Sequence, residues 1–401
     1  MNLLYVGTLP PHPGGSAVSC SQLLTSFARL GHRIRAVAPM ATAARGADDR
    51  FAHCHPEIEV HRFTVPRFQV DPSRALSPAE HREEEVQINE RVDRLMDLEA
   101  PDLVLLGRES YAWVATRFAE GRAAPCVLRV GGTLFHALAA GTYQAEHAGR
   151  YLGGCRAADL MIVQAPHMRE LAERLGMQRV AVVPNTVDLA QFVPRPSPAP
   201  LREALGIGAA DVVVMHASNL KAVKRPLDVV PVAARALAVD PRLVFVIVGD
   251  GIARPAMEDL CRRAGVADRF RFVGWVDYER MPEYLSLADV VMMPSEFEQQ
   301  ARVYLETQAA GRVLLASAVC SARDVVEHGR TGLLHRPGDV EDCADKLLRA
   351  AADPAGRARI GRQARARVVR HSVARIAPRF AAILEDVARR AHTLQTLRRT
   401  A

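Results

Sequence analysis

The stretch that decides the fold is Pro294-Ser295-Glu296-Phe297-Glu298-Gln299-Gln300-Ala301-Arg302-Val303-Tyr304-Leu305-Glu306. Residues 288–293 before it form a mostly apolar run of strand length, and residues 303–310 have a helical pattern that ends at Gly311. The sequence therefore predicts a strand, a turn and a helix, with Glu298 in the turn and Glu306 about one turn inside the helix. Backbone N–H groups at the start of such a helix face the carboxyl end of a parallel sheet, where anions bind. A carboxylate on either side of an anion site suits a ligand with both phosphates and hydroxyls, such as a sugar nucleotide.

The spacing of Glu298 and Glu306 indicates little by itself. The chain has 45 Asp and Glu residues, and most such pairs are one solvated carboxylate and one carboxylate on a helix face. The functional interpretation therefore depends on agreement with other stretches of the chain.

Length and composition favour a two-domain soluble enzyme. A chain of 401 residues exceeds a comfortable single core, and its 49% apolar and 24% charged residues are typical of globular proteins. Aromatic residues are few, at 5%, and the net charge of +7 comes from basic residues spread along the chain. A nucleic-acid module is therefore not favoured. The charge fits phosphorylated ligands, an anionic membrane surface or, most simply, a solvated surface.

The cysteines indicate a reducing compartment. There are seven, an odd number, without a C-x-x-C pair, so we expect free thiols and a cytoplasmic protein. No leader and no apolar run of membrane-spanning length is evident. The one metal-like cluster, His53-Cys54-His55, is interpreted as loop surface, because adjacent side chains point apart and no second ligand cluster follows. We expect no metal site.

Strands and helices alternate along both halves of the chain. In the first half we expect strands at residues 2–6, 33–38, 103–106, 126–130, 160–163 and 180–183, and helices at 18–30 and 78–98. Residues 194–200 contain four prolines and are the best candidate for a linker. In the second half we expect strands at residues 211–215, 243–248, 270–273, 289–293 and 313–317, helices at 226–237, 255–264 and 303–310, and a helical tail at 344–399. This pattern predicts an α/β protein with two Rossmann-like, doubly wound domains facing a cleft.

Two common α/β chemistries are excluded. The chain has no G-x-x-x-x-G-K-[ST] phosphate loop. The first strand-to-helix turn contains Gly14-Gly15 but no G-x-G-x-x-G, and the second strand ends near Pro39 without an acidic residue for a ribose. A nicotinamide-dependent dehydrogenase is therefore not expected.

Taken in order, seven stretches of the chain resemble the large family of retaining, nucleotide-sugar-dependent glycosyltransferases of the GT-B fold. That family includes glucosaminyl-malate synthase, glucosaminyl-inositol-phosphate synthase and phosphatidylinositol mannosyltransferases. The stretches are residues 13–15, 183–188, 218–225, 248–251, 272–275, 298–306 and 329–334. The resemblance implies an acceptor-binding domain at residues 1–193 and a nucleotide-sugar-binding domain at residues 201–372. A helix at about 375–401 would pack back on the first domain.

The resemblance also assigns roles in the second domain. Lys224 matches the lysine that binds the donor phosphates, and Lys221 would supply a second cation, so that charge on the leaving nucleotide is stabilised without a metal. A basic surface turn before a helix is the alternative interpretation of these lysines. Glu298 would hold hydroxyls of the donor sugar and Glu306 those of the ribose. The remaining donor-binding residues implied there are Asn219, Gly249, Val276 through its backbone beside the base, and Ala301, Arg302 and Val303 through their amides.

In the first domain the resemblance implies that Gly14 and Gly15 let a loop approach the diphosphate, since glycine has no Cβ. A simple turn is the alternative interpretation of the two glycines.

Two departures from the family pattern concern the sugar site. Gln299-Gln300-Ala301 replaces the usual Gly-Phe-Gly, and Gly131 stands where several relatives have a histidine near the reacting carbon. Arg129 or His136 could supply the missing contact, and Arg129 is our catalytic candidate beside Lys224 and Glu298.

We therefore expect a retaining, metal-independent transferase that uses a UDP-sugar as co-substrate and no further cofactor. The acceptor stays open between a small polar molecule, an antibiotic-like aglycone and a growing polysaccharide. We expect specificity to lie in loops at residues 67–80 and 131–149. Other activities left open are a sugar-nucleotide epimerase of the same fold and a catalytically silent GT-B partner subunit. Peripheral membrane contact and a homodimer also remain open.

Overall fold

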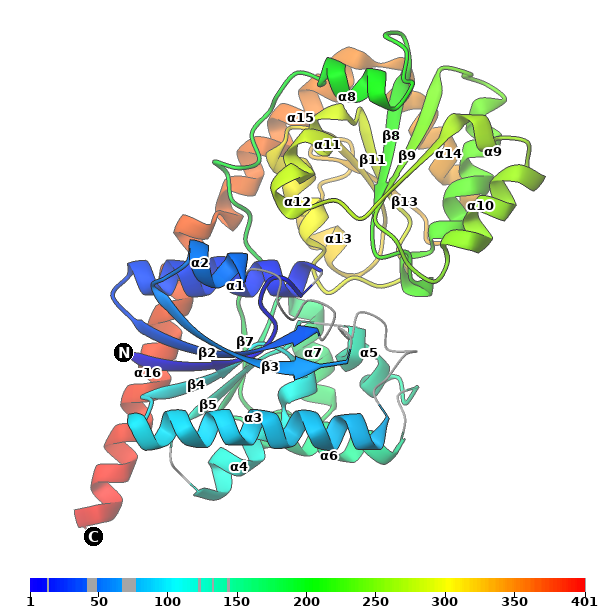
Figure 1. Cartoon of the computed structure of the whole chain (residues 1–401). Helices are drawn as coiled ribbons and strands as arrows, with labels where there is room; N and C mark the ends of the chain where they lie inside the picture. The colour runs from blue at the N-terminus through cyan, green and yellow to red at the C-terminus, as the bar shows by residue number, and fades with distance from the viewer. Residues whose placement is uncertain are drawn as a thin grey trace. The chain divides into compact units, whose positions relative to one another are not determined.

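Short apolar runs form the strands of two parallel sheets, and the segments between them form helices that cover the sheets (Figure 1). The computed structural model describes residues 1–12, 14–41, 49–66, 77–121, 124–131, 133–142 and 145–400. Pro13, Gly132, and residues 67–76 and 143–144 of the two expected specificity loops lie outside the described residues. The chain divides into unit 1, Met1–Asn185 with Val373–Ala401, and unit 2, Thr186–Ser372.

Unit 1 contains a seven-stranded sheet with the strand order β3-β2-β1-β4-β5-β6-β7. Its strands are β1 Asn2–Val6, β2 Arg33–Ala41, β3 Ile58–Val65, β4 Leu103–Leu106, β5 Cys126–Arg129, β6 Leu160–Val163 and β7 Val180–Val182. Every pair is parallel. Apart from Asn2, Arg33, Arg35 and Arg129, the interior strands consist of apolar residues, because helices bury both faces of a parallel sheet.

The helices of unit 1 come from both ends of the chain. They are α1 Gly15–Arg29, α2 Arg50–Cys54, α3 Pro78–Leu98, α4 Trp113–Gly121, α5 Thr133–Ala139, α6 Ala145–Ala157, α7 Pro166–Arg174 and α16 Val373–Thr400, with a 3₁₀ turn at Glu109–Tyr111. Ser77 and Glu80 form a capping box that starts α3. The Phe380 ring of α16 meets the Phe27 ring of α1 edge-on at 5.6 Å. The last helix therefore completes the core of unit 1.

Unit 2 contains a six-stranded parallel sheet with the order β10-β9-β8-β11-β12-β13. Its strands are β8 Val212–Ala217, β9 Leu243–Val248, β10 Phe270–Gly274, β11 Val290–Met293, β12 Val313–Ser317 and β13 Leu333–His335. Its helices are α8 Ala199–Ala204, α9 Val229–Leu237, α10 Arg254–Arg263, α11 Met281–Leu287, α12 Arg302–Ala309, α13 Cys320–Val325, α14 Val340–Ala352 and α15 Pro354–Val368. The predicted α/β class with two Rossmann-like, doubly wound sheets is confirmed.

The boundary between the units falls at Asn185 and Thr186 and not in the proline-rich residues 194–200. Val187 donates its N–H to the His371 carbonyl at 3.0 Å, and the Phe192 side chain is fully buried in the core of unit 2. The residues before the prolines are therefore part of unit 2. Proline content marked an irregular segment, but burial decides which unit the segment belongs to.

The sequence analysis missed several elements. The strand β3 lies at the edge of its sheet and contains Glu59, His61 and Arg62, so it has no continuous apolar run. Helices α4 to α7 and the three-residue strand β13 were also missed. His53 and Cys54, expected as loop surface, end the short helix α2 and are exposed. No helix in the described part of the chain is both long and apolar enough to cross a membrane.

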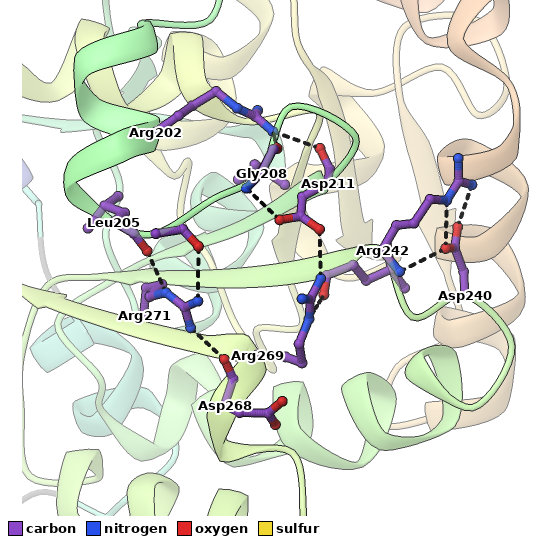
Figure 2. A network of polar contacts seen from close by, with 12 residues as sticks. Arg202, Leu205, Gly208, Asp211, Asp240, Arg242, Asp268, Arg269 and Arg271 are labelled. Carbon is purple, nitrogen blue, oxygen red and sulfur yellow. Dashed lines mark hydrogen bonds and ion pairs between the residues drawn. The ribbon is translucent and has the colours of Figure 1, made fainter.

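Arginine side chains brace the amino-terminal edge of the unit 2 sheet (Figure 2). The Asp211 carboxylate, directly before β8, accepts hydrogen bonds from Arg269 Nη2 at 2.9 Å and from the Gly208 N–H at 2.7 Å. Arg269 also donates to the Leu243 carbonyl at 2.9 Å, and Arg271 donates to the Leu205 carbonyl at 2.5 Å. These contacts occupy one edge of the sheet, whereas the candidate site lies at the opposite, carboxyl edge.

Candidate functional site

The carboxyl ends of β8 and β11 lie side by side in the middle of the unit 2 sheet. The strand order reverses there, since β9 and β10 follow on one side and β12 and β13 on the other. Ligands of open α/β sheets bind at such a switch point. The two loops that leave these strands touch, because Glu296 donates its N–H to the Val223 carbonyl at 2.9 Å.

Lys224 and Glu298 form an ion pair between these two loops. Lys224 Nζ lies 2.7 Å from Glu298 Oε2, and Ser295 Oγ donates to the other oxygen, Oε1, at 2.8 Å. The Glu298 side chain is only 5% exposed and that of Lys224 18%. Two residues that the sequence singled out therefore meet, and a third, Ser295, was missed although it directly follows the strand and Pro294.

A buried histidine holds the loop after β8. His216 Nδ1 lies 3.0 Å from the Met292 carbonyl, and Nε2 lies 2.8 Å from Ser218 Oγ. Because a carbonyl can only accept, Nδ1 bears the proton and Nε2 accepts the Ser218 hydroxyl. Ser218 Oγ in turn accepts the Leu220 N–H at 3.2 Å, and Leu220 has a left-handed φ of 37°. Burial lowers the pKa of His216 to about 4, so the histidine is neutral at neutral pH.

Non-glycine residues with positive φ gather at this edge of the sheet. Leu220 and Arg225 follow β8, and Cys320, with a φ of 40°, follows β12. Backbone strain of this kind is characteristic of ligand sites. Gly249, after β9, has a φ of 104°, and a Cβ there would lie 1.9 Å from the Ser218 carbonyl oxygen. Its glycine is therefore required for packing against the β8 loop.

Arg302 and Glu306 form a second, more deeply buried ion pair on α12. Arg302 Nη2 lies 3.1 Å from Glu306 Oε1, and their side chains are 7% and 6% exposed. Arg302 also donates to the Tyr278 hydroxyl and, at 3.3 Å, to the Thr186 carbonyl. These three groups hold the Arg302 guanidinium. Its backbone N–H remains in the first turn of α12, where Ala301 provides no side-chain cap.

The other predicted residues of unit 2 lie in loops at the same edge. Asn219 and Lys221 follow β8, and Val276 follows β10. The Asn219 Oδ1 atom is buried and accepts no hydrogen bond from any described residue. Such an atom is available to a ligand donor.

The predicted residues of unit 1 also lie at the carboxyl edge of their sheet. Gly14 precedes α1 with a φ of 105°, which favours glycine, and Gly15 is the first residue of the helix. Arg129 ends β5 and is 3% exposed. Its Nη2 donates to Ser19 Oγ at 2.9 Å and to Asn185 Oδ1 at 2.6 Å. The guanidinium is thus fixed within unit 1.

Gly131 is closely surrounded. Its N–H donates to Glu109 Oε2 at 3.0 Å, and a Cβ on it would lie 3.1 Å from Ser16 Oγ and 3.5 Å from Arg129 Nη1. A larger side chain at this position would have to share the space with Ser16 and the Arg129 guanidinium. His136 lies in α5, the helix that begins two residues after Gly131.

Within the described ranges, no three His, Cys, Asp or Glu side chains come together as a metal site requires. The candidate site contains two carboxylate–cation pairs, Lys224–Glu298 between the loops after β8 and β11 and Arg302–Glu306 on α12.

Two family models match the sequence. The "Glycosyl transferase 4-like domain" model matches residues 14–186, and the "Glycosyl transferases group 1" model matches residues 199–367. The first match lies in unit 1 and ends one residue beyond its boundary, at Thr186, and the second falls within unit 2.

Curated proteins match the chain in part. The D-inositol 3-phosphate glycosyltransferase of Kribbella flavida is 34% identical over 220 residues, which is 52% of this chain and 52% of that protein. The alpha-D-kanosaminyltransferase of Streptomyces kanamyceticus is 32% identical over 166 residues, 41% of this chain and 43% of that protein. The chain thus spans about half the length of the curated relatives it matches.

Solved structures match nearly the whole fold. Anabaena Alr3699/HepE in complex with UDP and glucose has a TM-score of 0.75 at 22% identity, over 96% of this chain and 100% of that one. Sucrose-phosphate synthase from Thermosynechococcus elongatus has a TM-score of 0.82 at 20% identity, over 96% and 99%. At these identities the likeness shows the fold alone. Together with the two consecutive family matches, it establishes that the chain belongs to the GT-B-fold family of glycosyltransferases.

Proposed function

We propose that the chain is a retaining glycosyltransferase that moves a sugar from a nucleotide diphosphate, a UDP-sugar, to a small-molecule or glycan acceptor. The observation that carries the proposal is the Lys224–Glu298 pair, 2.7 Å apart at the switch point of the unit 2 sheet. Lys224 would bind the donor phosphates there and Glu298 the sugar hydroxyls, beside the first turn of α12, which Ala301 does not cap with a side chain. The curated relatives, whose names describe sugar transfer, support the same reaction class.

In this proposal the bond between the anomeric carbon and the phosphate oxygen breaks, and the acceptor oxygen bonds to the same face of the sugar. Lys224 and Lys221 stabilise the charge that develops on the nucleotide diphosphate, with the N–H groups of Ala301, Arg302 and Val303. The leaving phosphate takes the acceptor proton. Two lysines in these positions do the work that a metal ion does in other phosphate sites, and no cofactor is invoked.

The carboxylates select the donor. Glu298 accepts hydrogen bonds from hydroxyls of the sugar, and Glu306 accepts them from hydroxyls of the ribose. Asn219 offers its buried Oδ1 to a donor group, and the backbone at Val276 faces the base. Gly249 acts indirectly, because it lets the β9 turn pack against the loop that bears Asn219 and Lys221.

Unit 1 provides the acceptor side. Gly14 and Gly15 give a loop without Cβ obstruction for the approach to the diphosphate. Arg129, fixed by Ser19 and Asn185, places a buried positive charge behind Gly131. The seven thiols, none of which forms a disulfide, support a cytoplasmic location.

A thermal-shift panel of UDP-, GDP-, ADP- and dTDP-sugars tests the donor site. A ligand at a hundred times its Kd adds about 2.7 kcal/mol of stability, so one nucleotide class should raise the midpoint of the wild type. Glu306→Ala should abolish that response. Glu341→Ala, at a side chain that is 70% exposed on α14, is the matched control and should respond like the wild type. A wild type that no nucleotide sugar stabilises would refute the donor site and favour a silent partner subunit.

Turnover distinguishes the remaining enzymes. A transferase consumes donor only with an acceptor present, whereas an epimerase converts the donor alone. Proton NMR of the product should show the anomeric configuration of the donor retained. An inverted product would contradict the retaining mechanism while leaving the donor site intact.

A further inference from the structure

Arg302 is a buried cation whose side chain contacts several groups of unit 2. It is 8% exposed, and it meets Glu306 Oε1 at 3.1 Å, the Tyr278 hydroxyl, and the Thr186 carbonyl at 3.3 Å. Its guanidinium carbon also lies 5.2 Å from the centroid of the Tyr278 ring. Burial alone would lower the pKa of this guanidinium, but Tyr278 and Glu306 raise it above its usual value. Arg302 is therefore charged and held from three directions.

Glu306 depends on this cation. Its side chain is 6% exposed, and a carboxylate so buried is stable as an anion only when a positive charge offsets the cost of leaving water. Arg302, whose Nη2 lies 3.1 Å from Glu306 Oε1, supplies that positive charge. Oε1 nevertheless accepts no well-aligned hydrogen bond from any described residue. The carboxylate is thus fixed in direction and keeps the capacity to accept hydrogen bonds from hydroxyl groups.

We propose that Arg302 is a positioning residue that holds the Glu306 carboxylate and aims it at the ribose diol of the donor. It thereby sets the preference for a ribonucleotide over a 2′-deoxyribonucleotide. This inference rests on the proposed function, in which Glu306 binds the ribose. It adds that the side chain of Arg302, the first residue of α12, acts on Glu306 and not on the donor sugar.

The geometry explains why an arginine is needed. The planar guanidinium presents several N–H groups at fixed angles, so one side chain reaches the carboxylate, the phenol and the carbonyl together. A lysine could neutralise Glu306 but could not hold all three groups. The contact with Thr186, the first residue of unit 2, also connects the start of this unit to α12, the helix that contains Glu306.

The test compares the affinities for UDP and 2′-deoxy-UDP by calorimetry in the wild type, Arg302→Met, Arg302→Lys and Tyr278→Phe. A hydrogen bond to a charged group contributes enough for about a ten- to a hundredfold preference for UDP in the wild type. Arg302→Met should bind UDP about tenfold more weakly or worse and lose the preference. Arg302→Lys should recover part of it, and Tyr278→Phe should lie between Lys and the wild type. Arg280→Met, at a side chain 56% exposed, should keep the wild-type ratio.

The ratio of the two affinities is decisive because general loosening of the fold weakens both ligands alike. A folded Arg302→Met that keeps the wild-type preference for UDP would overturn the inference. If the methionine variant fails to fold, the ratios of Arg302→Lys and Tyr278→Phe decide in the same way. A wild type that binds neither nucleotide would refute the proposed function together with this inference, whereas a wild type that binds both equally refutes only the ribose role.

Discussion

At the scale of single residues, the candidate site contains two pairs of opposite charges in direct contact. Glu298 has a cation on one oxygen and the Ser295 hydroxyl on the other. Removing one partner of a buried pair leaves an uncompensated charge, which costs more than the pair is worth. Single and double variants therefore separate the structural role of Lys224 from the catalytic role proposed for it.

Lys224→Met should lower kcat by about a hundred- to a thousandfold, the usual cost of losing one electrostatic contact to a developing negative charge. It should also destabilise the protein by up to about 3 kcal/mol, because Glu298 stays buried without its cation. The double variant Lys224→Met/Glu298→Gln should recover the stability but not the activity. Urea unfolding and donor turnover measure the two effects. A single variant with wild-type turnover would remove Lys224 from the chemistry.

His216 gives the protein a predictable response to acid. Its pKa is about 4 in the folded state because it is buried, and about 6.5 in the unfolded chain. The unfolded state therefore binds the proton first, so stability is full above pH 6.5 and falls between pH 6.5 and 4. His216→Gln should flatten this part of the profile of unfolding free energy against pH. His392→Gln, at an exposed residue of α16, should not change it. An unchanged slope in His216→Gln would contradict the buried neutral histidine.

At the scale of elements, the periodicity of apolar residues predicts those strands and helices whose pattern is set by which of their faces are buried. The apolar run before Pro294 and the helical pattern after Arg302 appear as β11 and α12, because a strand buried on both faces and a helix against a sheet leave clear patterns. The edge strand β3 left none, since Glu59 and Arg62 fit an edge position. For the same reason the positions of Glu298 and Glu306 could be predicted, and that of Lys224 followed from the family resemblance, but the direction of the Arg302 side chain could not. That direction depends on Tyr278 and Thr186, which are distant in sequence.

The amino edge of the unit 2 sheet offers a test at this scale. Burial favours the neutral form of Asp211, but its hydrogen bonds with Arg269 and Gly208 outweigh this and hold its pKa below the usual value. The carboxylate thus contributes stability above the pKa of about 3.9 in the unfolded chain, and this contribution is lost as the pH falls through the lower folded value.

Asp211→Asn should therefore lower the thermal midpoint at pH 7 and make little difference near pH 3. Asp268→Asn is a matched control, because Asp268 joins the network in Figure 2 through its backbone carbonyl. Differential scanning calorimetry across this pH range compares the two variants. Equal losses in both at pH 7 would show that the Asp211 carboxylate is not what braces the strands.

At the scale of the whole molecule, the chain passes from unit 1 to unit 2 once and returns once. The return at Val373 begins α16, and this helix places Ile376, Phe380 and Leu384 in the core that contains Leu3 of β1. The last 29 residues from Val373 to Ala401 are thus far from unit 1 in sequence but part of its fold. The stability of unit 1 must then depend on residues that follow all of unit 2 in the sequence.

Phe380→Ala tests this dependence. The ring is fully buried and meets Phe27 edge-on at 5.6 Å, so its loss should cost about 3–5 kcal/mol in unit 1. Hydrogen exchange followed by mass spectrometry should show faster exchange of the amides in β1 and β2, because their core has lost a side chain. The amides of β8 and β9 should be unaffected, since unit 2 has its own core. Leu394→Ala, at a residue 55% exposed on the same helix, should change neither unit. If β1 and β2 kept their protection in Phe380→Ala, α16 would be an appendage of unit 1 and not a part of its core.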